Sequence, residues 1–533
     1  MIKNLIANYQ LLITKIINWI KKNRWEAFWL ALILLIAAYF RIYKIDEYMT
    51  FLGDEGRDVI VVRRLLVNFD PILVGPGTSI GNMYLGPLYY YLIAPFLLLS
   101  NFSPVGPAVM VALLGVATVF LVWFITRNWF GKYAGFIASL LYSISPVVIT
   151  YSKSSWNPNI MPFFSLLIIW SLWKFWYEKK YGWFIVTMIS FAFTLQSHYL
   201  GLLLAPVLGL FWIITFLKII KLKLIVNRKS EIKNFRKSTA IGLILFLLLM
   251  SPLVFFDARH GWRNFSAIER FFTERQTTVS ARPWTAFPKM GSIFEDSLAR
   301  LVAGKDNLLG KRVSFLYYLS GGVIILFFLK RKLESKQKCA FLLLFTWIFF
   351  ALVGLGLYKQ HIYDHYYGFF FTAPFILFGG ISKNLMNKTN IFIRSLWFIG
   401  FGLAGLILVI SNLKENPIKY PPNMQLQRTI QISKKVIEES KSKEFNFAVI
   451  AERNYEGAYQ YFFEKWKAPF RVIDPQRLNE TITKQLFVIC EVPEEKCDPT
   501  HNPKAEIANF GWSEIVGRWE EDGLVIYKLV HTK

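Results

Sequence analysis

The densest early group of ionisable side chains lies in the stretch GDEGRD, residues 53–58. Asp54 and Glu55 stand side by side between two glycines, and Arg57 and Asp58 follow at once. A carboxylate can take a proton as a general base, and an arginine can hold a phosphate through paired N–H groups. We therefore predict that Asp54 and Glu55 are catalytic and that Arg57 and Asp58 bind substrate.

Further polar residues gather in three later stretches, TLQSHYLG, FDARHGWRN and YKQHIYDHYY. Lysine and arginine there could hold a phosphate or pyrophosphate, and histidine could form hydrogen bonds with a substrate. The plain alternative for each is a solvated loop charge or an aromatic anchor at a membrane interface. The predicted substrate-binding set is completed by His198, Arg259, His260, Arg263, Lys359, His365 and Tyr366.

GDEGRD also has a structural interpretation. Its acids could cap the N-terminus of an amphipathic helix over residues 57–68, where negative charge is favourable. Gly53 and Gly56 would let the backbone approach a substrate closely, because glycine has no side chain to block it. We expect Arg63 and Arg64, further along the same helix, to face lipid phosphates rather than to act in catalysis.

The elements that must position these residues are those of a membrane protein. Of the 533 residues, 54% are hydrophobic and 17% are aromatic, and the mean hydropathy is positive. The formal net charge is +26, but the basic residues fall mostly in short loops between apolar runs, without any nucleic-acid-binding motif. We therefore predict contact with membrane lipids and none with nucleic acid.

Eleven apolar runs predict a mainly α-helical, polytopic transmembrane bundle with about 11 spans. They cover residues 26–43, 104–126, 133–150, 158–177, 182–197, 200–220, 239–256, 313–330, 340–358, 366–382 and 391–411. A twelfth segment, GPLYYYLIAPFLLLS at 86–100, is short, aromatic-rich and interrupted by Pro95. We predict that it is an interfacial or re-entrant helix on the outer side, because counting it as a span would invert every later loop.

Loop charge sets the orientation. Lysine and arginine are concentrated in alternate loops, which are therefore expected to be cytoplasmic: 127–132, 174–180, 218–237, 330–338 and 382–394. This places a multi-pass protein in the plasma membrane with its N-terminus inside and its C-terminus outside. The expected domains are a cytoplasmic amphipathic segment 1–25, for which a short extra span is the alternative, and a membrane domain 26–411 with outer loops 44–103 and 257–312.

Residues 412–533 differ in composition and predict a small extracytoplasmic α/β domain. Short apolar runs suggest strands, and NYEGAYQYFFEKW between the first two suggests a helix. Cys490 and Cys497 could form a disulfide in an oxidising compartment, with two free thiols as the alternative. The expected strands are 445–451, 470–474, 484–491 and 524–530.

Over about residues 26–411 the sequence resembles the GT-C glycosyltransferases. More narrowly, it resembles the dolichyl-phosphate-mannose–protein mannosyltransferases (glycosyltransferase family 39) and their bacterial relatives, among them the aminoarabinose transferase of lipid A. GDEGRD is the most specific part of the resemblance. Four other stretches resemble the family without being diagnostic motifs: GPLYYYLIAP, YSKSSWNPN, QSHYLGLLLAP and HYYGFFFTAPFIL.

The resemblance implies an inverting enzyme that takes a sugar from a polyprenyl-phosphate donor. It maps the catalytic carboxylate onto Asp54, as the base for an acceptor hydroxyl on a protein, lipid or glycan, with Glu55 as its partner. Many family members carry a second Asp after the third span, where this chain has Asn157 and Asn159. No cofactor is therefore assigned with certainty, and a divalent metal is an open alternative.

The departing phosphate would need positive charge nearby, and Arg259, Arg263 or Lys359 could supply it. The WWDYG-type motif of oligosaccharyltransferases is absent from the sequence, which argues against transfer of a whole oligosaccharide to asparagine. Two other classes stay open: a multispanning transporter or flippase, and a polymerase or ligase for lipid-linked glycans. Transporters usually place ionisable residues near the midplane of the membrane, whereas the spans here are nearly free of charge.

Overall fold

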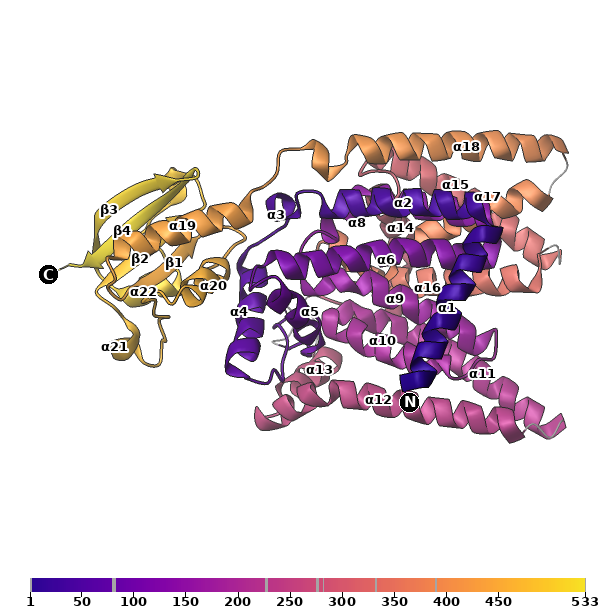
Figure 1. The fold of residues 1–533 in the computed structure, drawn as a ribbon, viewed down its shortest axis with the longest axis horizontal. Coiled ribbons are helices and arrows are strands. Elements are labelled where there is room, and N and C mark those ends of the chain that lie inside the picture. Colours follow the sequence, from indigo (N-terminus) through magenta and orange to yellow (C-terminus); the bar gives the residue numbers. More distant parts are fainter. Residues whose placement is uncertain are drawn as a thin grey trace.

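The computed structural model describes residues 2–78, 83–225, 229–274, 278–280, 282–330, 333–388 and 391–532. Its larger part is a bundle of long helices that run side by side, with a small α/β domain at one end (Figure 1). The N-terminal helix α1 (Ile2–Lys22) runs across the long helices rather than along them (Figure 1). The predicted fold class, a helical membrane bundle with a small C-terminal α/β domain, is confirmed.

Seven of the eleven predicted spans coincide with helices that are long and apolar enough to cross a bilayer. They are α2 (Arg24–Ile42), α6 (Val105–Phe130), η1 with α9 (Asn157–Ile160 and Met161–Trp176), η2 with α11 (Tyr199–Leu204 and Ala205–Ile225), α12 (Lys229–Arg259), α15 (Asn307–Leu329) and α16 (Ser335–Leu357). The other four runs are helical as well, but shorter or interrupted. They form α7 (Lys132–Ile144) with α8 (Pro146–Tyr151), α10 (Trp183–Ser197), η4 (Asp364–Phe370) with α17 (Ala373–Lys388), and α18 (Ile391–Lys414).

The predicted span 133–150 is split because Pro146 has no backbone N–H to continue the helix. The buried Arg41 of α2 donates from Nη1 to the carbonyl oxygen of Ser143 at 2.9 Å, so one acceptor at the end of α7 is satisfied from outside the helix. The break is thus stabilised by a side chain of a neighbouring span.

The segment 86–100 forms α5 (Leu88–Leu99), which has 12 residues and contains Pro95. At the usual rise per residue it extends about 18 Å, short of the ~30 Å of hydrocarbon that a span must cross. Its geometry therefore agrees with a helix that does not cross the membrane.

Three short helices lie at the end of the bundle that carries the α/β domain: α3 (Ile45–Tyr48), α4 (Gly53–Asn68) and α13 (Arg263–Thr273) (Figure 1). Residues 257–312 are largely helical, since α12 runs to Arg259 and is followed by α13, η3 (Pro283–Thr285) and α14 (Phe287–Leu301). Both predicted outer loops therefore present helices to the end of the bundle where the α/β domain lies.

Apolar side chains of the bundle are either buried between helices or exposed on its outer surface. Between the central helices, Trp129, Trp173 and Trp347 are at most 2% exposed. On α12, by contrast, Leu247 and Leu248 are 64% and 60% exposed. Leucines on the outside of a long helix are what contact with lipid tails requires, so α12 has the surface of a lipid-facing helix.

The α/β domain is a four-stranded sheet in the order β1-β2-β4-β3, with β1 and β2 parallel and the other pairs antiparallel. Aromatic side chains such as Phe447, Phe463 and Phe487 pack into its core. Its elements, after η5 (Pro417–Lys419), are α19 (Gln425–Ser440), β1 (Asn446–Ile450), α20 (Gly457–Lys465), α21 (Leu478–Thr481), β2 (Gln485–Cys490), η6 (Glu494–Lys496), α22 (Ala505–Phe510), β3 (Ser513–Glu521) and β4 (Leu524–His531).

Two details of this domain differ from the sequence prediction. Residues 470–474 form no strand and make only a single bridge, between Phe470 and Phe445. The edge strand β3 was not predicted, because most of its side chains are exposed and it lacks a buried apolar run. The predicted pairing of Cys490 with Cys497 is present as a disulfide that joins the last residue of β2 to the loop after it.

Candidate active site

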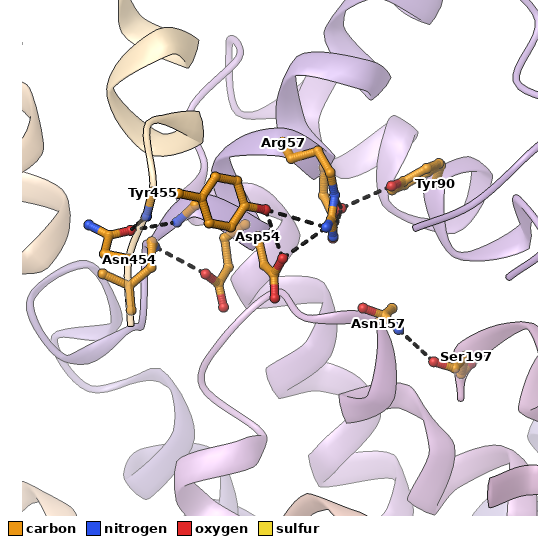
Figure 2. Close-up of polar contacts among 11 residues, drawn as sticks. Asp54, Arg57, Tyr90, Asn157, Ser197, Asn454 and Tyr455 are labelled. Atoms are coloured by element: carbon orange, nitrogen blue, oxygen red, sulfur yellow. Dashed lines mark hydrogen bonds and ion pairs between the residues drawn. The ribbon is translucent and has the colours of Figure 1, made fainter. Parts of the chain in front are cut away.

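Helix α4 begins at GDEGRD, and its first turn is capped partly by a distant segment. The N-cap residue Leu52 has an apolar side chain, which cannot accept a hydrogen bond from the first backbone amides of the helix. The Glu55 carboxylate accepts the Leu52 N–H at 3.0 Å. The Gly53 N–H instead donates to Oδ1 of Asn454, in the α/β domain, at 2.9 Å (Figure 2). The position of Asp54 therefore depends on two parts of the chain.

Asp54 belongs to a connected polar network (Figure 2). Arg57 donates from Nη1 to Asp54 Oδ1 at 2.8 Å, and from Nε and Nη2 to Asp58 Oδ1 at 3.0 and 2.8 Å. The hydroxyl of Tyr455 donates to Asp54 Oδ1 at 2.8 Å, and that of Tyr90 to Asp58 Oδ1 at 3.0 Å. The guanidinium thus joins an accessible carboxylate, 40% exposed, to one that is 1% exposed.

The two carboxylates differ in environment. Burial raises the pKa of Asp58 to about 6, against the opposing effect of the neighbouring Arg57 cation and its hydrogen bonds. Asp58 has no open side toward a substrate, because it is enclosed by α4 and α5. Its contacts suit a support for Arg57, whereas Asp54 is the carboxylate that substrate can reach.

A cavity of about 260 Å³ opens beside Asp54 and Arg57. It brings together residues from the first loop, from the turn before α9, from the end of α10 and from η4. Of the predicted site residues it is lined by Asp54, Arg57, His198, His365 and Tyr366. The rest of its lining is Pro76, Gly77, Thr78, Leu85, Trp156, Asn157, Pro158 and Tyr199.

His198 and His365 both line this cavity, and their rings meet edge to face with centroids 5.9 Å apart. Burial lowers the pKa of His198 to about 3 and that of His365 to about 4, so both rings are neutral near pH 7. The Leu200 N–H donates to Nδ1 of His198 at 3.2 Å. Neutral His198 therefore carries its proton on Nε2 and can act as a hydrogen-bond donor.

Asn157 fixes the geometry on the same side of the cavity. Its Nδ2 donates to the carbonyl oxygen of Ser197 at 2.6 Å, which ties η1 to the end of α10 next to His198 (Figure 2). A carboxylate at this position could not make that bond, because an ionised Asp only accepts. Asn157, which stands where many family members carry an Asp, thus has a structural role as a hydrogen-bond donor.

Glu55 is not brought to the cavity. It is 5% exposed and points back to the N-terminus of α4, where it accepts the Leu52 N–H. Burial raises the pKa of Glu55 to about 8, against the smaller opposing effect of its backbone hydrogen bonds. The capping interpretation of GDEGRD therefore describes Glu55, and the role of catalytic partner to Asp54 finds no support in its contacts.

Five predicted substrate-binding residues also lie outside the cavity lining: the buried Asp58, described above, and four basic residues. Arg259, His260 and Arg263 are exposed at the corner between α12 and α13, where His260 stacks on Phe256 at 4.0 Å. Lys359 is exposed just beyond α16, and its backbone N–H donates to Thr278. Asp54 and Arg57 of the first loop come together with His198 and His365, but these four residues do not join them.

Four expectations for α4 are corrected by its contacts with the α/β domain. Arg63 and Arg64 do not face lipid phosphates: both pair with Glu464 of α20, at 3.0 and 2.8 Å. Gly53 and Gly56 face the same domain, since a Cβ on either would lie within 2.5 Å of Tyr455 or of the Gly457–Ala458 backbone. The close approach permitted by these glycines is to protein.

The residues that the structure describes do not fit a divalent metal. Among them no three side chains of His, Cys, Asp or Glu converge, and the one carboxylate lining the cavity is already paired with Arg57. No step is assigned to a metal for this reason.

A larger cavity, of about 580 Å³, lies at the opposite end of α10. Its charged lining residues are Lys179, Lys180 and Lys237, and it has no carboxylate or histidine to act as a base. The chemistry is therefore assigned to the smaller cavity beside Asp54.

Sequence reasoning missed Asn454 and Tyr455. They lie in the loop before α20, 401 residues beyond Gly53 and Asp54. Nothing in NYEGAYQYFFEKW distinguishes them from the surface of a small domain. The docking of this loop on α4 becomes visible only in the structure, where Gly457 lies against the Gly53 carbonyl.

Comparison with known proteins agrees with this architecture. The family model for dolichyl-phosphate-mannose-protein mannosyltransferase matches residues 85–256, about a third of the chain. No curated protein matches the sequence.

Two solved structures share the fold. ArnT from Cupriavidus metallidurans, bound to undecaprenyl phosphate, aligns over 95% of this chain and 98% of its own, with 11% identity and a TM-score of 0.57. The archaeal oligosaccharyltransferase AglB from Archaeoglobus fulgidus, in complex with an inhibitory peptide and a dolichol-phosphate, aligns over 88% of this chain and 70% of its own. Its identity is 14% and its TM-score 0.51.

The resemblance deduced from the sequence is thereby confirmed. The chain has the GT-C fold shared with ArnT and AglB, and over residues 85–256 it matches the dolichyl-phosphate-mannose-protein mannosyltransferase family.

Proposed function

We propose that this membrane protein transfers a single sugar from a polyprenyl-phosphate donor to a hydroxyl of a protein, lipid or glycan, with inversion at the anomeric carbon. The observation that carries the proposal is Asp54, an accessible carboxylate that is held by Arg57 and lines a cavity together with two neutral histidines. The fold supports it, because ArnT and AglB were solved with undecaprenyl phosphate and dolichol-phosphate.

Asp54 is the general base in this mechanism. Arg57 and Tyr455 both donate to its Oδ1, so Oδ2 is the oxygen left to accept the proton of the acceptor hydroxyl. As that proton moves, the acceptor oxygen bonds to the anomeric carbon from the face opposite the phosphate. The bond from that carbon to the phosphate oxygen breaks, and the polyprenyl phosphate leaves with the bonding electrons.

The leaving phosphate needs hydrogen-bond donors and positive charge. Arg57 has five N–H groups, and four are used by Asp54, Asp58 and Tyr455, which leaves one for a phosphate oxygen. His198 can add its Nε2–H, since its Nδ1 already accepts from Leu200. Donors already in place where charge develops stabilise a transition state without reorganising.

We also infer that the site faces the outer side of the plasma membrane, with the N-terminus cytoplasmic. The Lys- and Arg-rich loops support this orientation through the positive-inside rule. The Cys490–Cys497 disulfide supports it as well, because disulfides persist in oxidising compartments. The lipid tail of the donor would then lie among the spans while its phosphate reaches Asp54 and Arg57.

Substitution of Asp54 tests the mechanism. The purified protein is reconstituted in liposomes and given undecaprenyl-phosphate-linked mannose, glucose or galactose, each with a radiolabelled sugar, together with a membrane extract as acceptor. Asp54→Asn is expected to lower transfer about a thousandfold or more, since it removes the base but keeps the shape. The control is Asp46→Asn, which changes an exposed acid of α3 outside the cavity.

Three results would contradict the proposal. Asp54→Asn with wild-type transfer would remove Asp54 from the mechanism. Wild-type protein that transfers no sugar from any donor, but moves the intact donor across the bilayer, would identify a flippase. Wild-type protein that joins whole lipid-linked glycans, but transfers no single sugar, would identify a polymerase or ligase.

A further inference from the structure

The α/β domain contributes a side chain to the candidate active site. Tyr455, in the loop before α20, donates its hydroxyl hydrogen to Asp54 Oδ1 at 2.8 Å. The Tyr455 hydroxyl oxygen accepts from Arg57 Nη1 at 3.3 Å, and Arg57 Nη1 also donates to Asp54 Oδ1, so the three groups form a closed triangle (Figure 2). A domain that merely covered the membrane part would not need such a bond to the proposed base.

Helices α4 and α20 meet with almost no side chain between them, which fixes the position of Tyr455. A Cβ on Gly56 would lie 2.2 Å from the backbone nitrogen of Ala458, and one on Gly457 would lie 2.4 Å from the Gly53 carbonyl oxygen. Contacts this close leave the two helices little freedom to slide past each other, because a backbone cannot move aside as a flexible side chain does.

A second chain of bonds runs from the sheet to the start of α4. Glu491 follows β2 directly and accepts from Asn454 Nδ2 at 2.8 Å and from the Tyr459 hydroxyl at 2.6 Å. Asn454 Oδ1 then accepts both the Gly53 N–H and the Tyr455 N–H, each at 2.9 Å. One asparagine therefore caps α4 and holds the backbone that carries Tyr455.

These contacts make a specific assignment. We propose that Tyr455 is a positioning residue that holds Asp54 with Oδ2 toward the acceptor, and that the α/β domain is therefore part of the active site. Without the hydroxyl, the Asp54 side chain could rotate and present either oxygen, or neither, to the acceptor. The inference rests on the proposed function, because it assigns to Asp54 the role of base.

The chain offers a matched pair of tyrosines for the test. Tyr461, on α20, also crosses between the two parts of the protein, and its hydroxyl donates to the Phe102 carbonyl oxygen at 2.6 Å. Neither Tyr461 nor Phe102 lines the cavity, and the bond of the Tyr461 hydroxyl is to Phe102 and not to Asp54. Tyr455→Phe and Tyr461→Phe each remove one hydrogen bond across the interface, but only the first removes a bond to the proposed base.

Both variants are assayed in liposomes with undecaprenyl-phosphate-linked mannose, glucose and galactose, from pH 5 to 9. For Tyr455→Phe we expect kcat to fall about tenfold, the usual effect of losing a hydrogen bond to a charged group, with donor KM within about twofold. The acidic limb of its pH profile should move to higher pH, because the ionised carboxylate has lost a donor. Tyr461→Phe should retain kcat within about twofold and keep the wild-type profile.

Each other result has a definite meaning. If Tyr455→Phe keeps wild-type kcat and pH profile while Asp54→Asn is inactive, the positioning role is wrong and the proposed function stands. If both tyrosine variants lose activity equally with an unchanged profile, the hydroxyl serves docking alone, and the inference is again wrong. If wild-type protein turns over no donor, the proposed function fails and the inference fails with it.

Discussion

Two charged regions at the same end of the bundle have opposite structural characters. In α4, Asp54, Arg57 and Asp58 are joined in one network and held against a second domain. At the corner between α12 and α13, Arg259 and Arg263 are exposed and lie outside the cavity lining. The two stretches look equally promising as sequence, and what separates them is the set of distant residues that each one meets.

The corner has one buried acid, and it serves the fold. Asp257 is 5% exposed and accepts the backbone N–H groups of Asn264 and Phe265 at 2.7 and 3.1 Å, which caps α13. The buried acid of the corner, Asp257, thus caps a helix terminus, whereas the buried acid of α4, Asp58, holds the Arg57 guanidinium beside an open cavity. The comparison predicts that substitutions in α4 affect turnover and that those in the corner do not.

After Asp54→Asn, the largest effect on turnover is expected at Arg57. Arg57→Gln removes the cation that holds Asp54 and leaves Asp58 buried without its charged partner. We expect kcat to fall about 10²- to 10³-fold in the liposome transfer assay. Arg57→Lys should restore less than about a tenth of the wild-type rate, because an ammonium cannot bridge two carboxylates as a planar fork does.

Retention of more than half of the wild-type rate by Arg57→Gln would remove this difference between the two regions. A fall in Tm matching the loss of activity would instead point to misfolding. Thermal unfolding in detergent therefore accompanies each rate measurement.

The next largest effect is expected where α4 meets α20. Gly56→Ala places a methyl group 2.2 Å from the Ala458 backbone, so the two helices must separate. We expect transfer to fall roughly tenfold or more, and stability to fall by about 1–3 kcal/mol, as overpacking usually costs. Thermal unfolding and the transfer assay measure the two effects.

The matched control is Gly209→Ala in α11, where a Cβ meets nothing within 4 Å. It should leave transfer unchanged and could add a few tenths of a kcal/mol of stability, since alanine favours a helix. Equal behaviour of the two variants would show that the contact between α4 and α20 is dispensable.

The helical bundle could be predicted from the sequence because its signal is local. A span is a continuous apolar run, and the eleven runs all fall on helices. The strand at 513–521 escaped prediction for the opposite reason, since an exposed edge strand has no buried face to leave a pattern.

The candidate site could be predicted only in part. His198 and His365 could be predicted because four of the six histidines, these two among them, lie together with other ionisable residues at the predicted outer face of the membrane. Tyr455 could not be found, because tyrosine is common, with 25 in the chain, and its relation to Asp54 spans 401 residues. Glu55 was paired with Asp54 because the two are adjacent, yet successive residues of a helix point about 100° apart and meet different neighbours.

An effect on stability without an effect on the catalytic contacts is expected from Glu55. Burial raises its folded pKa from 4.5 to about 8, so the folded state holds a proton that the unfolded state releases. Stability should therefore fall as pH rises through this window, by on the order of a few kcal/mol. Between pH 6 and 8, Tm of the wild type should fall more than Tm of Glu55→Gln, which keeps the shape without the ionisation. Parallel curves would show that Glu55 is ionised when folded.

The smallest effect is expected at the exposed corner. Arg259→Gln and Arg263→Gln, alone or together, should leave kcat and donor KM within about twofold of wild type, because neither side chain lines the cavity. Exposed charges also contribute little to stability, so Tm should change by less than about 2 °C. This outcome would separate the corner from α4, where one arginine is expected to control the rate.

A rise of tenfold or more in donor KM would instead show that the corner contacts the donor phosphate before transfer, as the sequence alone suggested. The double variant is decisive for that alternative, since two arginines sharing one phosphate can each mask the loss of the other.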